Sequence, residues 1–216
     1  LGDGIVHITY APKLPTGQPY LSPMIAKRKF SGPSRYKWDE AAQKLRTAAL
    51  EIGWDGSCWA IARGEEALER ICVERWQKDS IALKLFPAAL SDVLGLGQKL
   101  DPDQRTPSWL GRDRTPGDVF GNAMSYSDIA ASGNTQVPIA YLIGEQGGNH
   151  ALFFDTPYPT SFAFAAREAR VKAEGSDSLG LFVLTGRDLP ELRRDYLDLT
   201  GKPPVPPLKA FGLWIS

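Results

Sequence analysis

Residues Gly180–Ser216 read GLFVLTGRDLPELRRDYLDLTGKPPVPPLKAFGLWIS, and they place several kinds of element in a row. The apolar run Leu179–Leu184 predicts a strand. Four prolines between Pro203 and Pro207 predict a stiff, extended spacer, because proline fixes φ and cannot continue a helix. The apolar run Ala210–Ile215 then suits a strand buried on both faces. It is either the first strand of a further domain or an edge strand that folds back on the same domain.

A short helix is predicted between the first strand and the proline spacer. Asp188 suits the N-cap position and Glu191 follows three residues later, which is the spacing of a capping box. Gly201 suits the position that ends a helix. The apolar face expected for this helix consists of Leu189, Leu192, Tyr196 and Leu199. A rigid arm that carries the chain from one domain into the next would have this order of elements.

The same stretch resembles the junction in family 31 glycoside hydrolases, the α-glucosidase and α-xylosidase family, where a β-sandwich leads into a catalytic (β/α)8 barrel. The matching residues are Tyr196, Leu199, Thr200, Gly201, Pro203, Pro204, Pro206, Pro207, Gly212, Trp214 and Ser216. Two upstream segments also resemble the family: LGLGQ (Leu94–Gln98), with Gln98 in place of the usual glutamate, and QVPIAYL (Gln136–Leu142) followed by ALFFD (Ala151–Asp155).

The resemblance implies an all-β fold, an antiparallel β-sandwich of the galactose-mutarotase type. It implies a β-sandwich domain over residues 1–186 and a short C-terminal linker helix with the Pro-rich spacer over 187–209. Residues 210–216 would be the first strand of a (β/α)8 barrel that this chain does not contain. Strands at intervals of about ten residues, separated by turn signals, independently favour a sandwich.

The alternation of apolar and polar residues predicts the positions of these strands. The expected strands are Ile5–Tyr10, Ala48–Gly53, Ser57–Ala62, Arg70–Gln77, Ser80–Phe86, Val93–Leu100, Val137–Ile143, Ala151–Asp155, Ser161–Ala169 and Leu179–Leu184. Asp39–Leu50 contains helix-forming residues, but the family resemblance favours strands there. Gly64–Glu69 is expected to be a polar turn, and Asp101–Gly133 a long irregular loop of the kind that is usually functional or disordered.

Composition excludes several classes of function. The chain has 216 residues, 43% of them hydrophobic, and equal numbers of acidic and basic residues. No basic surplus indicates nucleic acid as a partner, no apolar run is long enough to span a membrane, and no motif calls for a cofactor.

Two cysteines and two histidines have no recognisable chemical setting. Cys58 and Cys72 form no CxxC motif, so small buried thiols are expected, with a disulfide as the alternative. His7 and His150 are expected to be structural or surface residues rather than catalysts. The absence of glycosylation sequons and of paired cysteines favours a cytoplasmic protein.

The family resemblance also indicates where chemistry lies. Retaining glycosidases need two carboxyl groups about 5 Å apart, and both catalytic aspartates of the family come from the barrel, so no catalytic residue is expected in this chain. The family's sandwich contributes a loop that places an aspartate on the sugar. Asn122 falls at that position here, with Asp118 or Asp128 as substitutes if the alignment shifts. The alternative interpretation is that Asn122 is a plain turn residue after Gly121. Trp109 of the same loop is a second candidate for sugar binding.

Three functions follow as hypotheses. The first is the non-catalytic N-terminal region of an α-glycosidase, whose partner is an α-linked oligosaccharide bound through the missing barrel. The second is a free-standing carbohydrate-binding sandwich without catalysis. The third is a mutarotase-like enzyme, which would need a His and Glu pair in a cleft.

Overall fold

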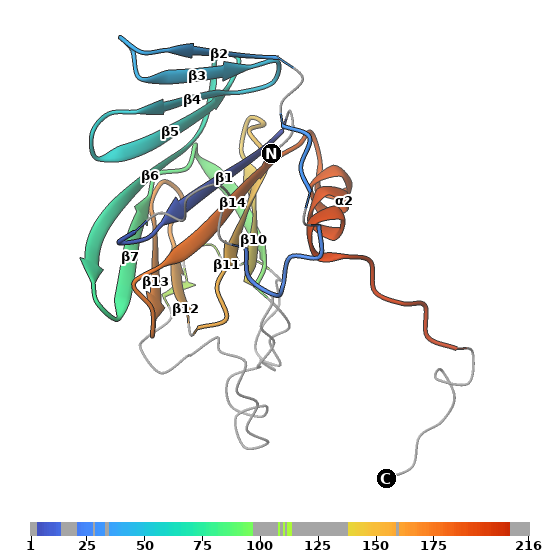
Figure 1. Cartoon of the computed structure of the whole chain (residues 1–216). Coiled ribbons are helices and arrows are strands. Elements are labelled where there is room, and N and C mark those ends of the chain that lie inside the picture. The colour runs from blue at the N-terminus through green and yellow to red at the C-terminus, as the bar shows by residue number, and fades with distance from the viewer. Residues whose placement is uncertain are drawn as a thin grey trace.

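The computed structural model describes residues 4–13, 21–27, 29–32, 35–96, 108, 110, 112–113, 138–158 and 160–207. Its strands are β1 (Ile5–Tyr10), β2 (Tyr36–Asp39), β3 (Lys44–Thr47), β4 (Glu51–Trp54), β5 (Cys58–Arg63), β6 (Glu66–Gln77), β7 (Ser80–Leu85), β8 (Leu90–Gly95), β9 (Arg112–Asp113), β10 (Ile139–Gly144), β11 (His150–Asp155), β12 (Thr160–Phe164), β13 (Ala169–Glu174) and β14 (Leu179–Thr185). They form a five-stranded sheet in the order β1-β14-β11-β10-β8 and a nine-stranded sheet in the order β2-β3-β4-β5-β6-β7-β13-β12-β9. The two sheets pack face to face (Figure 1), so the all-β sandwich expected from the sequence is confirmed.

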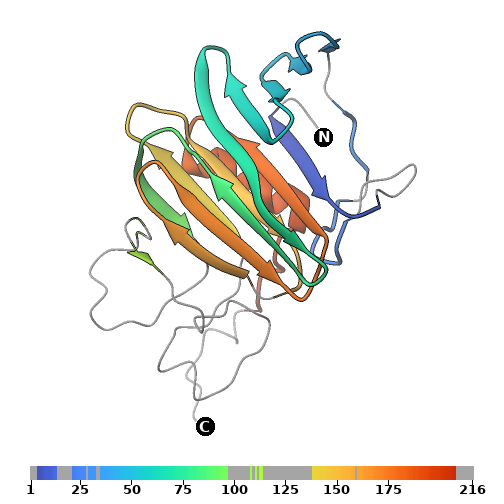
Figure 2. The same ribbon diagram turned by 90° about the vertical axis from the view of Figure 1, so that its left-hand side faces the viewer.

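The nine-stranded sheet has one buried and one exposed face, and its strands alternate accordingly. In β13, Ala169, Val171 and Ala173 are buried, while the three residues that alternate with them are exposed. The period of two places every second side chain between the sheets. Figure 2 views this sheet face-on, with the remaining layers behind it.

The five-stranded sheet is buried on both faces. All six residues of β11 are buried, as are the first six of β14. The outer face of this sheet is covered by helix α2 (Leu189–Thr200) and by residues 21–27 and 29–30 (Figure 1). Leu192 and Leu199 of the helix pack there against Phe153 and Phe182. The near-continuous apolar sequence of β11 and β14 follows from this double burial.

Helix α2 begins and ends where the sequence predicts. The side chain of Asp188 accepts a hydrogen bond from Glu191 N at 2.9 Å. The Glu191 carboxylate accepts from the backbone N–H of Arg187 at 2.9 Å, so the capping box closes one residue before the N-cap. Gly201 ends the helix at φ 90°, a conformation that favours glycine. One of the four expected apolar positions is wrong, because Leu189 is 37% exposed.

The segment at residues 21–27 is fixed by polar contacts at both ends. Asp155, at the end of β11, accepts hydrogen bonds from the backbone N–H of Ser22 at 2.9 Å and from its hydroxyl. The N–H groups of Ala26 and Lys27 donate to the Leu199 carbonyl at 2.9 and 3.0 Å. The buried aspartate of the ALFFD motif therefore holds the segment that covers the sheet beside α2.

Most expected strands are present, and two expectations are wrong. The ambiguous stretch at Asp39–Leu50 contains a strand, β3. Gly64–Glu69 is not a polar turn, because β6 already begins at Glu66 and Leu68 is fully buried. Ser161–Ala169 is not one strand, because β12 ends at Phe164 and β13 begins at Ala169.

The cysteines are not free thiols, since Cys58 of β5 and Cys72 of β6 form a disulfide. The register explains why sequence spacing did not indicate it. Arg63 lies opposite Glu66, and an unbroken register would place Cys58 opposite Ile71. A bulge between Ile61 and Ala62 shifts the pairing by one residue, so the two cysteines lie directly opposite with a Cα–Cα distance of 4.2 Å.

The proline spacer leaves the sandwich after α2. Residues 202–207 are all exposed, and Val205 is 91% exposed. The described part of the spacer therefore lies outside the sandwich (Figure 1). The strand expected at Ala210–Ile215 lies outside the described residues. None of the described helices is long and apolar enough to cross a membrane.

Leu192→Ala should lower the free energy of unfolding by about 2–5 kcal/mol, because the side chain is fully buried between α2 and the sheet. Leu189→Ala is the matched control, since it makes the same change in the same helix at a position that is 37% exposed, and it should cost less than about 1 kcal/mol. Urea denaturation of the two variants measures the difference. Equal losses would mean that α2 does not pack as described.

Candidate functional site

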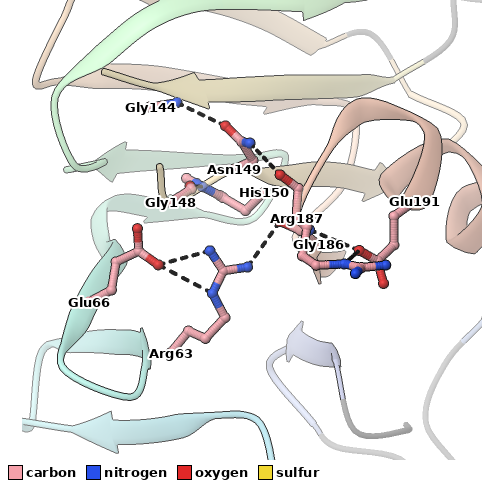
Figure 3. Close-up of polar contacts among 9 residues, drawn as sticks. All are labelled: Arg63, Glu66, Gly144, Gly148, Asn149, His150, Gly186, Arg187 and Glu191. Carbon is pink, nitrogen blue, oxygen red and sulfur yellow. Dashed lines mark hydrogen bonds and ion pairs between the residues drawn. The ribbon is translucent and has the colours of Figure 1, made fainter. Parts of the chain in front are cut away.

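A polar cluster joins three connections at one end of the sandwich, as Figure 3 shows. Arg63, at the end of β5, donates two hydrogen bonds to Glu66 Oε2, from Nη2 at 2.8 Å and from Nε at 3.2 Å. Its Nη1 donates to the Gly186 carbonyl at 2.9 Å. The guanidinium therefore ties the turn between β5 and β6 to the connection between β14 and α2.

Asn149 makes the second tie to the same connection. Its side-chain amide donates to the Arg187 carbonyl at 2.8 Å, and its side-chain oxygen accepts from Gly144 N at 3.3 Å. The Arg187 guanidinium in turn donates to Glu191 at 3.1 Å (Figure 3). The turn between β10 and β11 thus holds the start of α2, from which the proline spacer continues.

Beneath these contacts lies a sealed pair of ionisable residues. His150 of β11 and Glu69 of β6 belong to opposite sheets, and both side chains are fully buried. His150 Nε2 lies 3.3 Å from Glu69 Oε2, and Nδ1 lies 2.8 Å from the Gly148 carbonyl oxygen. Glu69 Oε1 also accepts from Arg70 N at 3.0 Å. Burial raises the pKa of Glu69, and the contacts with His150 oppose that rise.

The hydrogen bonds imply that this pair shares one proton. If Nδ1–H donates to the Gly148 carbonyl, Nε2 either donates to a Glu69 carboxylate or accepts from a protonated Glu69. Both arrangements leave the pair neutral overall, as burial requires. His150 is therefore a structural residue that joins the two sheets. Because both side chains are fully buried, a substrate has no access to them.

A hollow of about 400 Å³ opens beside the cluster. It is lined by Glu66, Ala88, Ala89, Glu145, Gln146, Gly147 and Arg167. Its carboxylate, amide and guanidinium groups are suited to hydrogen bonds with hydroxyl groups. Gly147 has a φ of 105°, and a Cβ there would lie 3.0 Å from Glu66 Oε1, so glycine lets this carboxylate approach the turn. Among the described residues, none form a group of three or more metal-ligating side chains.

His7, the other histidine, does not belong to the polar cluster. His7 stacks on Phe182 with ring centroids 4.2 Å apart, and burial lowers its pKa to about 4. It is therefore neutral at pH 7 and contributes an apolar contact beneath the layer that includes α2.

The sugar-binding candidates from the sequence are not among the residues that the structure describes: Trp109, Asp118, Asn122 and Asp128 all lie outside them. Described points of the same loop are anchored to the sandwich. Arg112 of β9 lies opposite Phe164 of β12, and the Ser108 hydroxyl accepts from Val93 N at 3.3 Å. In the LGLGQ motif a Cβ at Gly95 would lie 2.4 Å from the Ile139 carbonyl oxygen, so only glycine fits where β8 leaves for this loop.

The sequence analysis predicted neither the polar cluster around Arg63 nor the buried pair of Glu69 and His150. Glu69 and His150 are 81 residues apart and in different sheets, so their contact depends on how the sheets are stacked. The one signal was a histidine directly before the buried apolar run at residues 151–154.

The comparisons with known proteins found similarity to carbohydrate-active enzymes. No family model matches the chain. A curated protein, alpha-glucosidase 2 of Bacillus thermoamyloliquefaciens, is 35% identical over 74 residues. The GH31 dextranase of Flavobacterium johnsoniae complexed with isomaltotriose aligns over 97% of this chain with a TM-score of 0.71 and 18% identity. The cycloalternan-forming enzyme of Listeria monocytogenes, in complex with a pentasaccharide substrate, aligns over 98% with a TM-score of 0.67 and 19% identity.

These likenesses confirm the resemblance to family 31 that the sequence carries. At such identities the solved structures establish the fold alone, which this chain shares with the GH31 dextranase and with the cycloalternan-forming enzyme. The chain spans 26% of the dextranase, 20% of the cycloalternan-forming enzyme and 9% of the curated α-glucosidase.

His150→Ala should lower the free energy of unfolding by about 3–5 kcal/mol at pH 7, because it leaves Glu69 buried without its partner. His7→Ala serves as the control, since it removes a histidine that is already neutral and is described with no hydrogen-bond partner at Nε2. It should cost clearly less. Guanidinium denaturation of both variants tests this, and a His150→Ala variant as stable as the wild type would refute the sealed pair.

Proposed function

We propose that this chain is the N-terminal β-sandwich region of a family 31 α-glycosidase, an enzyme that hydrolyses O-glycosyl bonds. The observation that carries the proposal is the agreement of two independent likenesses. The fold matches family 31 enzymes over 97% of the chain, and a stretch of sequence is 35% identical to a curated α-glucosidase. A sandwich alone would host many functions.

In this proposal the sandwich is non-catalytic and positions a barrel. The domains are the sandwich over residues 1–186, the helix and Pro-rich spacer over 187–209, and the first barrel strand over 210–216. The polar cluster supports a positioning role, because Arg63 and Asn149 hold the connection into α2 from two different turns. A helix fixed in this way gives the exposed spacer a defined starting direction.

The substrate contacts of the sandwich belong to the loop between β8 and β10. Asn122 is the proposed substrate-binding residue, with Asp118 or Asp128 as substitutes, and Trp109 is the second candidate. An amide accepts one hydrogen bond from a sugar hydroxyl and donates another without carrying a charge. The bound ligand is an α-linked oligosaccharide, held mainly by the barrel.

The burial of His150 argues against the mutarotase-like alternative. That chemistry needs a His and Glu pair that reaches a sugar, and the pair in this sandwich is fully buried. The free-standing binding module is disfavoured by the Pro-rich spacer, which such a module does not need.

The disulfide bears on the compartment. The cytoplasmic location expected from the sequence rested partly on unpaired cysteines, and Cys58 and Cys72 are paired. Structural disulfides persist in oxidising compartments and are rare in the cytosol. We therefore propose an oxidising compartment for the protein. Thiol labelling after extraction without reductant should then find both cysteines blocked.

Two forms of the protein test the proposed function: this chain alone, and a parent form that continues past Ser216. The chain should not hydrolyse p-nitrophenyl α-glucoside, α-xyloside or α-galactoside, since the catalytic carboxylates are expected in the barrel. The longer form should hydrolyse at least one of them.

Two results would overturn the proposal. One is turnover that copurifies with the chain alone and scales with its concentration. The other is a folded longer form that is inactive on all three substrates and on α-linked oligosaccharides.

A further inference from the structure

Strands β2, β3 and β4 extend beyond the five-stranded sheet at one end of the nine-stranded sheet (Figures 1 and 2), and the described residues on their inner face become more exposed toward β2. Registered pairs trace that face outward from the core. Ile61 lies opposite Ile52, Ile52 opposite Leu45, and Leu45 opposite Trp38. Ile61 and Ile52 are buried, whereas Trp38 is 50% exposed.

A second exposed ring lies on the same face. Tyr36 is two residues from Trp38 on β2, so both side chains point to one side of the strand. Tyr36 is 70% exposed. Further in, Trp54 and Trp59 pack with ring centroids 4.8 Å apart and are half-buried. Strand β2, at the edge of the sheet, therefore exposes two aromatic rings, and the apolar side chains of β3, β4 and β5 lie next to them on the same face.

Charge is segregated to the opposite face of the same strands. Lys44 and Arg46 both bind Glu51 across β3 and β4. Their side chains point away from the aromatic face, because they alternate with Leu45 along the strand. The face that carries Tyr36 and Trp38 therefore has aromatic rings, an indole N–H and a phenol hydroxyl. The charges of Lys44, Arg46 and Glu51 lie on the other face. A neutral polyhydroxylated ligand fits that chemistry better than a charged peptide or nucleic acid.

The exposed apolar surface on the inner face of β2, β3 and β4 is aromatic rather than aliphatic. Ile52 is only 8% exposed and Leu45 packs against the core, so little aliphatic surface remains for a protein partner. Tyrosine and tryptophan rings combine an apolar face with a polar edge, which suits a sugar ring that has apolar C–H faces and peripheral hydroxyls.

From this geometry we propose that Tyr36 and Trp38 form a surface binding site for a neutral α-linked glucan. The site is separate from the cluster that holds α2, and the proline spacer leaves the molecule away from β2 (Figure 1). It would hold polymeric substrate near the enzyme rather than contact the bond that is cleaved. The proposal rests on the proposed function for the choice of ligand, but its test requires no catalysis.

Affinity electrophoresis of this chain in native gels that contain dextran or soluble starch tests the site. The wild type should be retarded in at least one gel relative to a gel without polysaccharide. Trp38→Ala and Tyr36→Ala should each weaken the association by roughly threefold to tenfold. Trp76→Ala is the matched control, because Trp76 is 42% exposed and lies on β6, with its indole N–H bound to the Asp177 carbonyl. It should bind as the wild type does.

Melting temperatures of the three variants, measured beside the gels, establish that each is folded. No retardation of the wild type in either gel would overturn the glucan site, even if the longer protein hydrolyses glycosides. Equal loss in Trp76→Ala would overturn the assignment to β2. A concentration-dependent dimer that Trp38→Ala disrupts, without retardation by either polysaccharide, would identify a second copy of the chain as the occupant instead.

Discussion

The double burial of the five-stranded sheet is the constraint on which the rest of this structure depends. Strands as apolar as β11 and β14 need a cover on each face, and the nine-stranded sheet supplies only one. Helix α2 and the segment at residues 21–27 supply the other. The helix is thereby part of the packed structure, and the direction of the proline spacer is set by the core.

Buried polar groups make that arrangement specific. Asp155 holds the covering segment through Ser22, and Glu69 with His150 joins the two sheets. Each such group costs free energy unless its partners are in place, so alternative packings are penalised. Nearer the surface, Arg63 and Asn149 donate hydrogen bonds to the connection that leads into α2. Two neighbouring turns therefore support one connection.

The sequence predicted what depends on local pattern, and it failed where distant contacts decide. Capping residues and glycine determine the ends of α2 locally, so the predicted caps, Asp188 and Gly201, were right. Leu189 was misplaced because helical period alone does not reveal which side faces the sheet. The turn expected at Gly64–Glu69 was wrong because tertiary burial of Leu68 overrides the polar appearance of its neighbours. The disulfide depends on a bulge and the His150–Glu69 pair depends on sheet stacking, so local sequence identifies neither pairing.

Amide hydrogen exchange in α2 tests most directly whether the helix is part of the sandwich. The account predicts that the amides of Tyr196–Leu199 exchange with opening free energies similar to those of β14, because both open only when the packed layers separate. Residues 202 and 205 in the spacer should exchange at nearly unprotected rates in the same experiment. If the α2 amides exchanged as fast as the spacer while β14 stayed protected, the helix would be an independent linker and the central claim would fail.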